Sequence, residues 1–207
     1  MINYGYINSG YDERDIILDE RYEEASVDLP KTYDFTEYLD INCKDQGNKP
    51  WCVPFSLGLA IETRRKLDGE NNFWIDVEDI FSQGGNENGM MIRDALAYMK
   101  KVGYKSENGN ERFRINAYGK LNSYLAIMRS VYINGPCIMG MPVRDDGRTD
   151  FWNGGDLLGG HAIACVGWDE DGLILMNSWG RGFGYNGRCY LSFDDVSSKI
   201  LECWTFI

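Results

Sequence analysis

The sequence contains a single histidine, His161, among its 207 residues. Its six cysteines are dispersed, without a Cys-x-x-Cys pair and without companion histidines at ligand spacing, so a structural zinc site is disfavoured. No apolar run reaches the roughly 18 residues of a membrane-spanning helix. Residues 1–11 lack the basic start and apolar stretch of a secretion signal. The sequence therefore predicts a soluble protein that is made without export and stays in the cytoplasm.

Basic residues are fewer than acidic residues. Lysine and arginine number 21 against 32 aspartates and glutamates, which leaves a formal net charge of -11. A surface of this sign is repelled by phosphate backbones and by anionic lipid. Nucleic acid and membranes are therefore not expected as partners. The oligomeric state is left open.

The composition is sufficient for a folded hydrophobic core, since 43% of the residues are hydrophobic and aromatic residues occur along the whole chain. The length suits one large domain or two lobes that share a cleft. We find no internal repeat and no linker that would divide the chain into independent domains. Residues 1–28 are charged and aperiodic and are expected to form an arm on the surface of the body.

Local patterns change from helical to strand-like along the chain. Helices are predicted from Cys52 to about Gly69 and over residues 77–81, 91–102 and 121–133. Strands are predicted over residues 137–143, 161–168, 173–178 and 188–193. The expected class is α+β, with a helical lobe over about residues 48–133 and a strand lobe over about residues 134–207.

Cys52 falls at the N-terminal end of a predicted buried helix, where unpaired N–H groups and the helix dipole stabilise a thiolate. A cysteine nucleophile needs a base, and His161 is the one histidine available. Taken alone, Cys52 is better explained as a small buried residue, and His161 as a core histidine satisfied by hydrogen bonds.

Asn177 follows the predicted strand over residues 173–176 and precedes Ser178, Trp179 and Gly180. Its side-chain carbonyl can accept a hydrogen bond from one imidazole nitrogen while the other nitrogen faces sulfur. The indole of Trp179 is placed to shield that bond from water. The alternative is an ordinary asparagine at a strand-to-turn junction.

Three segments, taken together, resemble the motifs of papain-like cysteine peptidases in the order that this family has them. Residues 45–47, read Asp-Gln-Gly, with Cys52 six residues after Gln46, resemble the nucleophile motif. Residues 160–162, read Gly-His-Ala, and residues 177–180, read Asn-Ser-Trp-Gly, resemble the histidine and asparagine motifs. The likeness runs from about Leu29 to the C-terminus, so residues 29–207 are expected to form the peptidase domain. The short arm is more like the prokaryotic and viral branch, which lacks a long propeptide.

The resemblance implies a two-lobe fold, with a helical lobe and a β-barrel-like lobe and the active-site cleft between them. It implies peptide hydrolysis through a Cys52–His161–Asn177 triad and an acyl-enzyme intermediate, with no cofactor and no metal, and a polypeptide substrate as the partner. Gln46 and the backbone N–H of Cys52 would form the oxyanion hole.

The same resemblance implies a set of substrate-binding positions. The backbone of Met90 would pair with an extended peptide. Met91, Ile92 and Ala162 would form an apolar, adaptable pocket for a side chain of that peptide. For the methionines and for the isoleucine, core packing is an equally good interpretation. The substrate-binding residues implied are Met90, Met91, Ile92, Ala162 and Trp179.

The chain also departs from the family pattern. Lys49 and Glu87 stand where the family has a cysteine pair, which fits a protein kept reduced and suggests a contact between these two residues. Two other functions stay open: a non-catalytic homologue that binds but does not turn over, and an amidase or acyl transferase acting on a non-peptide amide. The arm is expected either to complete the strand lobe or to cross the cleft and limit access to Cys52.

Overall fold

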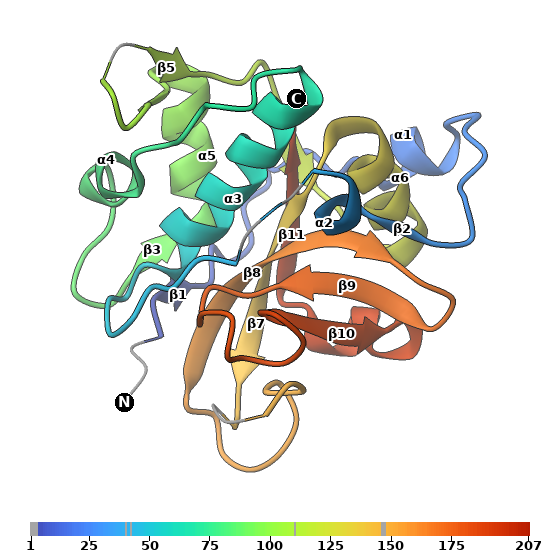
Figure 1. The fold of residues 1–207 in the computed structure, drawn as a ribbon. Helices are drawn as coiled ribbons and strands as arrows, with labels where there is room; N and C mark the ends of the chain where they lie inside the picture. Colours follow the sequence, from blue (N-terminus) through green and yellow to red (C-terminus); the bar gives the residue numbers. More distant parts are fainter. Residues whose placement is uncertain (1–3, 40, 42, 110, 146–147) are drawn as a thin grey trace.

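An antiparallel sheet of seven strands lies at the centre of the computed structural model, which describes residues 4–39, 41, 43–109, 111–145 and 148–207 (Figure 1). Six strands follow one another in the order β10-β9-β8-β7-β11-β6, and β2 pairs with β8. Within the described residues β10 and β6 do not pair, so the sheet is open and not a closed barrel. The strands of this sheet are β2 (Tyr33–Asp34), β6 (Tyr118–Lys120), β7 (Cys137–Val143), β8 (Gly159–Trp168), β9 (Gly172–Met176), β10 (Arg188–Ser192) and β11 (Glu202–Phe206).

The two faces of this sheet bury different side chains, because successive residues of a strand point to opposite sides. On β8, Ala162 and Ala164 lie in one hydrophobic core while Ile163 and Cys165 lie in the other. The strands predicted over residues 137–143, 161–168, 173–178 and 188–193 are confirmed to within two residues at each end.

The first core is covered by α3 (Cys52–Leu67), α4 (Val77–Ser82) and α5 (Ile92–Lys101). α3 ends near Gly69 and α5 near Gly103, whose φ angles of 91° and 84° favour glycine. Both helix ends agree with the prediction. β3 (Met90–Met91) precedes α5, and β4 (Tyr104–Lys105) pairs with β5 (Arg112–Phe113) after it.

The helix α6 (Tyr124–Asn134) lies on the other face of the sheet, next to α1 (Asp19–Glu23) (Figure 1). Ala126, Ile127 and Val131 of α6 belong to the second core, together with residues of β7 and β8. The sequence placed residues 121–133 in the helical lobe, whereas the apolar side chains of α6 pack in a different core from those of α3, α4 and α5. The apolar residues of α6 could pack in either core, and the position of a helix along the sequence does not indicate which face of the sheet it covers.

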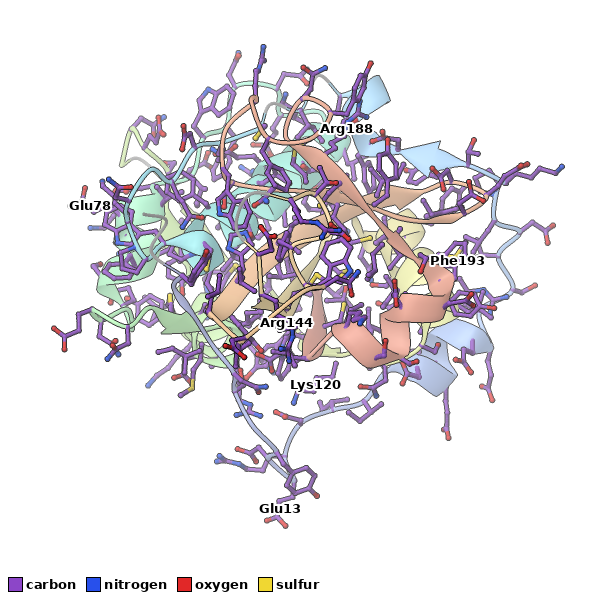
Figure 2. The ribbon with its side chains drawn as sticks, turned by 90° about the horizontal axis from the view of Figure 1, so that it is seen from below. Glu13, Glu78, Lys120, Arg144, Arg188 and Phe193 are labelled. Carbon is purple, nitrogen blue, oxygen red and sulfur yellow. The ribbon has the colours of Figure 1, made fainter. Side chains whose placement is uncertain are left out.

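The N-terminal segment is built into the body. β1 (Tyr6–Ile7) pairs in parallel with β3, and Ile17 bridges to Lys120 at the edge of the main sheet. Between them the chain makes a loop, with Glu13 at a tip that stands away from the body (Figure 2). The remaining short elements are α2 (Phe35–Tyr38), η1 (Phe193–Asp195) and α7 (Val196–Lys199). Residues 1–3 of the predicted arm lie outside the described residues.

Candidate active site

Cys52 is the first residue of α3 and is fully buried. Burial raises the pKa of its thiol to about 11, and hydrogen bonds from the backbone amides of Ala162, Gly5 and Val53 offset that rise only in part. Ala162 directly follows His161 on β8. The sulfur therefore lies beside the strand that carries the histidine, as the resemblance implies.

His161 is also fully buried, and its Nε2 lies 2.7 Å from Oδ1 of Asn177. Oδ1 also accepts the backbone N–H of Ser178 at 2.7 Å, which identifies it as the carbonyl oxygen of the amide. Nε2 must therefore carry the proton in the neutral ring, and Nδ1 has a free lone pair. Nδ1 is buried and has no hydrogen-bond partner among the described residues. Burial lowers the pKa of His161 to about 4, against the opposing effect of the bond to Asn177.

Aromatic rings enclose the imidazole. The ring centroid of Trp179 lies 4.6 Å from that of His161, and the edge of Phe151 meets the imidazole at 5.5 Å and 84°. Phe183 packs edge-on against Trp179 at 5.0 Å. Trp179 thus shields the His161–Asn177 bond, as its position in the sequence suggested. Phe151 was missed, because it lies in a turn-rich segment where no local pattern indicates a buried ring.

Gln46 connects the loop before Cys52 to the segment that carries Asn177. Its backbone N–H donates to the carbonyl of Ser178 at 2.8 Å, and its side-chain oxygen accepts from Oγ of Ser178 at 2.7 Å. Its Nε2 donates to the carbonyl of Lys49 at 3.0 Å. The side chain is buried, and these bonds hold its amide in one orientation.

Three of the predicted substrate-binding side chains are packed in the first core: Met90, Ile92 and Ala162 are each no more than 1% exposed. Met91 is half-buried. The backbone N–H of Met90 donates to the carbonyl of Gly5 at 2.8 Å. The backbone of Met90 does therefore pair with an extended strand, but in this structure the strand is the chain's own arm.

The arm passes directly over Cys52. A Cβ on Gly5 would lie 2.0 Å from the carbonyl oxygen of Pro50, so only glycine fits there. On either side of it, Tyr4 packs against Gly159 and Tyr6 against Gly160, the two residues before His161. The space that these two glycines leave is thus filled by the two tyrosines.

The suggested contact between Lys49 and Glu87 is not found. Nζ of Lys49 lies 3.9 Å from the ring centroid of Trp51, and no ion pair joins it to Glu87 in the described part of the chain. A cation over an indole face is attracted by the ring quadrupole, and Lys49 makes this contact. All six cysteines are free.

No family model matches the sequence. The sequence is 26% identical to papaya proteinase 4 of Carica papaya over 216 aligned residues, which cover 88% of this chain and 59% of the papaya protein. It is 30% identical to cathepsin B-like cysteine proteinase 6 of Caenorhabditis elegans over 40% of this chain and 24% of that protein. The chain thus spans less than two thirds of the length of these relatives.

Solved structures match over far more of the chain. Xylellain, a cysteine protease from Xylella fastidiosa, superposes with a TM-score of 0.82 at 21% identity, covering 99% of this chain and 96% of xylellain. The Carica candamarcensis cysteine protease CMS1MS2, in complex with E-64, gives 0.70 at 17% identity, covering 86% of this chain and 98% of that one.

The chain has the papain-like cysteine protease fold. The relatives and neighbours named above are cysteine proteases, and so hydrolases. In the described part of this papain-like chain, no three His, Cys, Asp or Glu side chains are grouped to hold a metal ion. No described helix is long and apolar enough to cross a membrane.

Proposed function

We propose that this chain is a thiol-dependent endopeptidase that uses Cys52 as nucleophile, His161 as base and Asn177 to orient the imidazole. The observation that carries the proposal is the 2.7 Å bond between His161 Nε2 and Asn177 Oδ1. It leaves Nδ1 as the unprotonated nitrogen, and the sulfur of Cys52 lies beside the next residue of the same strand. The cysteine protease relatives support the same chemistry.

The reaction follows from these groups. Nδ1 takes the thiol proton as sulfur attacks the peptide carbonyl, and the imidazolium returns that proton to the departing amine when the C–N bond breaks. Water, activated by the same imidazole, then hydrolyses the thioester and restores the thiol. The amide of Gln46 and the N–H of Cys52 stabilise the oxyanion, and one such donor typically contributes about 2.7 to 4 kcal/mol to the transition state.

The described arrangement is a closed form of this peptidase, with residues 4–7 of the arm held between β3 and β8. With Gly5 bonded to Met90 and with Tyr4 and Tyr6 packed on the two glycines before His161, a substrate has no room beside Cys52. The arm thus acts as a segment that inhibits the peptidase unit, residues 29–207.

The test is labelling with an irreversible thiol reagent, followed by mass analysis of the labelled peptides and a peptide-library digest. After removal of the arm segment, rapid labelling confined to Cys52 together with cleavage of peptides is expected. Labelling without turnover would favour the non-catalytic homologue. Hydrolysis of small amides but not of peptides would favour the amidase.

A further inference from the structure

Four arginines line one cavity at the end of α3 that is remote from Cys52. Arg64 and Arg65 lie in the last turn of this helix, Arg112 lies on β5, and Arg114 follows that strand. The C-terminal end of α3 and β5 both lie toward the top of Figure 1. The cavity has a volume of about 400 Å³, which is in the range of pockets that hold small molecules. Because α3 has 16 residues, about 20 Å of helix separates this cavity from the nucleophile.

Three of these guanidiniums are held in place by backbone carbonyls. Nη1 of Arg64 donates to the last carbonyl of α6 at 2.7 Å, and Nη1 of Arg112 donates to the carbonyl of Gly103 at 2.6 Å. Nη2 of Arg114 donates to the last carbonyl of α5 at 2.9 Å. A guanidinium has five N–H groups, so these bonds fix the orientation of each side chain and leave other donors for a ligand.

The fourth guanidinium, that of Arg65, keeps a donor unused. Its Nη2 pairs with Glu70 and, at 3.0 Å, with Glu111, and its Cζ lies 4.6 Å from the ring centroid of Phe73. Its Nε is buried and has no hydrogen-bond partner in the part of the chain that the structure describes. A buried donor without a partner costs free energy. The two carboxylates therefore do not satisfy Arg65 fully.

The other three arginines have no carboxylate within hydrogen-bond distance among the described residues. Nε of Arg64 is 3.8 Å from Asp68, and Nη1 of Arg112 is 3.8 Å from Asp79. The described bonds of Arg114 go to backbone carbonyls. Positive charge thus gathers at this cavity in a chain whose net charge is -11. Like charges around one cavity repel one another, and a bound anion would relieve that repulsion.

The cavity also has an apolar part. Phe113 is half-buried, and Phe206 meets it edge-on with ring centroids 6.5 Å apart. Ile115, which is buried, belongs to the same lining. Stabilisation of helix ends by arginine explains single bonds of these side chains, but it does not explain why four guanidiniums and two phenylalanines line one space. The lining instead matches a ligand with an anionic end and an apolar end.

We propose that this cavity binds a small organic phosphate, with its phosphoryl group on the guanidiniums and its apolar part on the phenylalanines. The planar fork of arginine matches two phosphate oxygens, and a phosphate dianion brings charge for more than one guanidinium. An aromatic lining favours a flat apolar group. An acidic peptide fits less well, because its carboxylates are spread along an extended chain whereas these arginines surround one cavity. The site is separate from the proposed peptidase site and does not depend on that function.

Calorimetry on the full chain tests the chemistry of the ligand. The probe is phenyl phosphate, and inorganic phosphate and phenol represent its two ends. Phenyl phosphate is expected to bind at least roughly tenfold more tightly than either of them, because it contacts the arginines and the apolar lining together. Equal affinity for inorganic phosphate would indicate a site for a bare anion, and equal affinity for phenol would indicate an apolar pocket. Either result would overturn the proposal.

Substitution tests the location of the site. Arg112→Gln and Arg114→Gln each remove one positive charge from the cavity, and each should weaken the binding of phenyl phosphate at least roughly tenfold. Arg148→Gln is the matched control, because Arg148 is exposed, pairs with Asp150 and lies outside the cavity. Unchanged affinity in both cavity variants, or an equal loss in the control, would contradict binding at this cavity.

Thermal unfolding gives a second measurement that does not depend on the folding of any variant. A ligand that binds the folded chain raises the melting temperature as its concentration increases. Phenyl phosphate should therefore raise the melting temperature of the unaltered chain further than inorganic phosphate does at the same concentration. A melting temperature that does not rise, or that rises equally with both, would overturn the proposal. Peptide hydrolysis is not measured in these experiments, so failure of the peptidase proposal would leave their results unchanged.

Discussion

Cys52 and His161 are both uncharged near neutral pH in the closed form, and burial is the common cause. It raises the pKa of the thiol to about 11 and lowers the pKa of the imidazole to about 4. Burial therefore disfavours a thiolate–imidazolium pair while the arm covers the site. Uncovering the two residues restores water to both and brings the two pKa values toward each other, which is the condition for nucleophilic attack near neutral pH.

Substitution of the four candidate catalytic residues should separate essential from supporting roles. Cys52→Ala and His161→Ala are expected to abolish peptide hydrolysis by the opened protein, because no other group supplies the nucleophile or the base. Asn177→Ala and Gln46→Ala should leave residual activity, since orientation and oxyanion binding assist the reaction without forming or breaking bonds. Initial rates on one peptide measure all four, and their combined effects should be far from additive. Full activity of Cys52→Ala would end the proposal.

His161 should also make folding stability depend on pH. Its pKa is lower in the folded chain, at about 4, than the value of 6.5 for an unperturbed histidine. As the pH falls, His161 therefore takes up a proton in the unfolded chain before it does so in the folded chain. The free energy of unfolding decreases as the pH drops from about 6.5 to about 4. A shift of this size corresponds to about 3 kcal/mol.

Because the chain has one histidine, His161→Gln removes the whole histidine contribution. Urea unfolding of both proteins at pH 7, 6 and 5 is the measurement. The difference in unfolding free energy between them should shift in favour of the variant as the pH falls, with the pH 7 difference as internal reference. A pH-independent difference would show that His161 is as easily protonated in the folded chain as in the unfolded one.

At the scale of elements, the N-terminal segment consists of two parts with different roles. Residues 4–7 cover the active site, whereas α1 packs against α6 and Nε1 of Trp168 donates to the carbonyl of Pro30 at 3.1 Å. The loop between the parts is exposed, with Tyr11 93% accessible. A proteolytic cut in this exposed loop would free the part that we propose to be inhibitory and would leave the structural part attached.

Two truncations should distinguish these parts. A chain that starts at Tyr11 is expected to gain a large increase in the alkylation rate of Cys52 with a small loss of stability. A chain that starts at Leu29 should lose several kcal/mol more of its unfolding free energy, because it also lacks Tyr22, a residue of the second core that is 4% exposed. Alkylation kinetics and urea unfolding measure the two effects. Alkylation that is unchanged in the chain starting at Tyr11 would show that the arm is purely structural.

At the scale of the whole molecule, stability depends on two hydrophobic cores and not on covalent links. All six cysteines are free, and the sulfur atoms of Cys137 and Cys203, which contact each other, are 3.5 Å apart, far beyond a bond. Burial raises the pKa of both thiols, which keeps them protonated and slow to react.

Thermal unfolding should therefore be insensitive to reductant. The melting temperature with and without dithiothreitol is expected to agree within the error of the measurement, since a native disulfide would contribute roughly 2 to 5 kcal/mol. A chemically oxidised sample serves as the control for bridges formed on handling. A melting temperature several degrees lower in reductant alone would mean that the folded protein contains a disulfide.

The sequence by itself determined the local features of this protein. The apolar face of α3 with its closing glycine, the alternation along β7 to β9, and the order of Cys52, His161 and Asn177 all lie in short segments whose spacing carries the information. Local periodicity and turn residues act over a few positions, so they can be recognised without a structure.

Only the tertiary structure decided the features that join distant segments. Tyr6 and Glu202 meet across 196 positions, Phe151 reaches His161 from a turn, and α6 covers the far face of the sheet. In the sequence Tyr6 is one aromatic residue of a polar arm and Glu202 one of many acids. Their pairing depends on the folded positions of β1, β7 and β11, since a contact of this kind is stabilised only after the strands between them have packed.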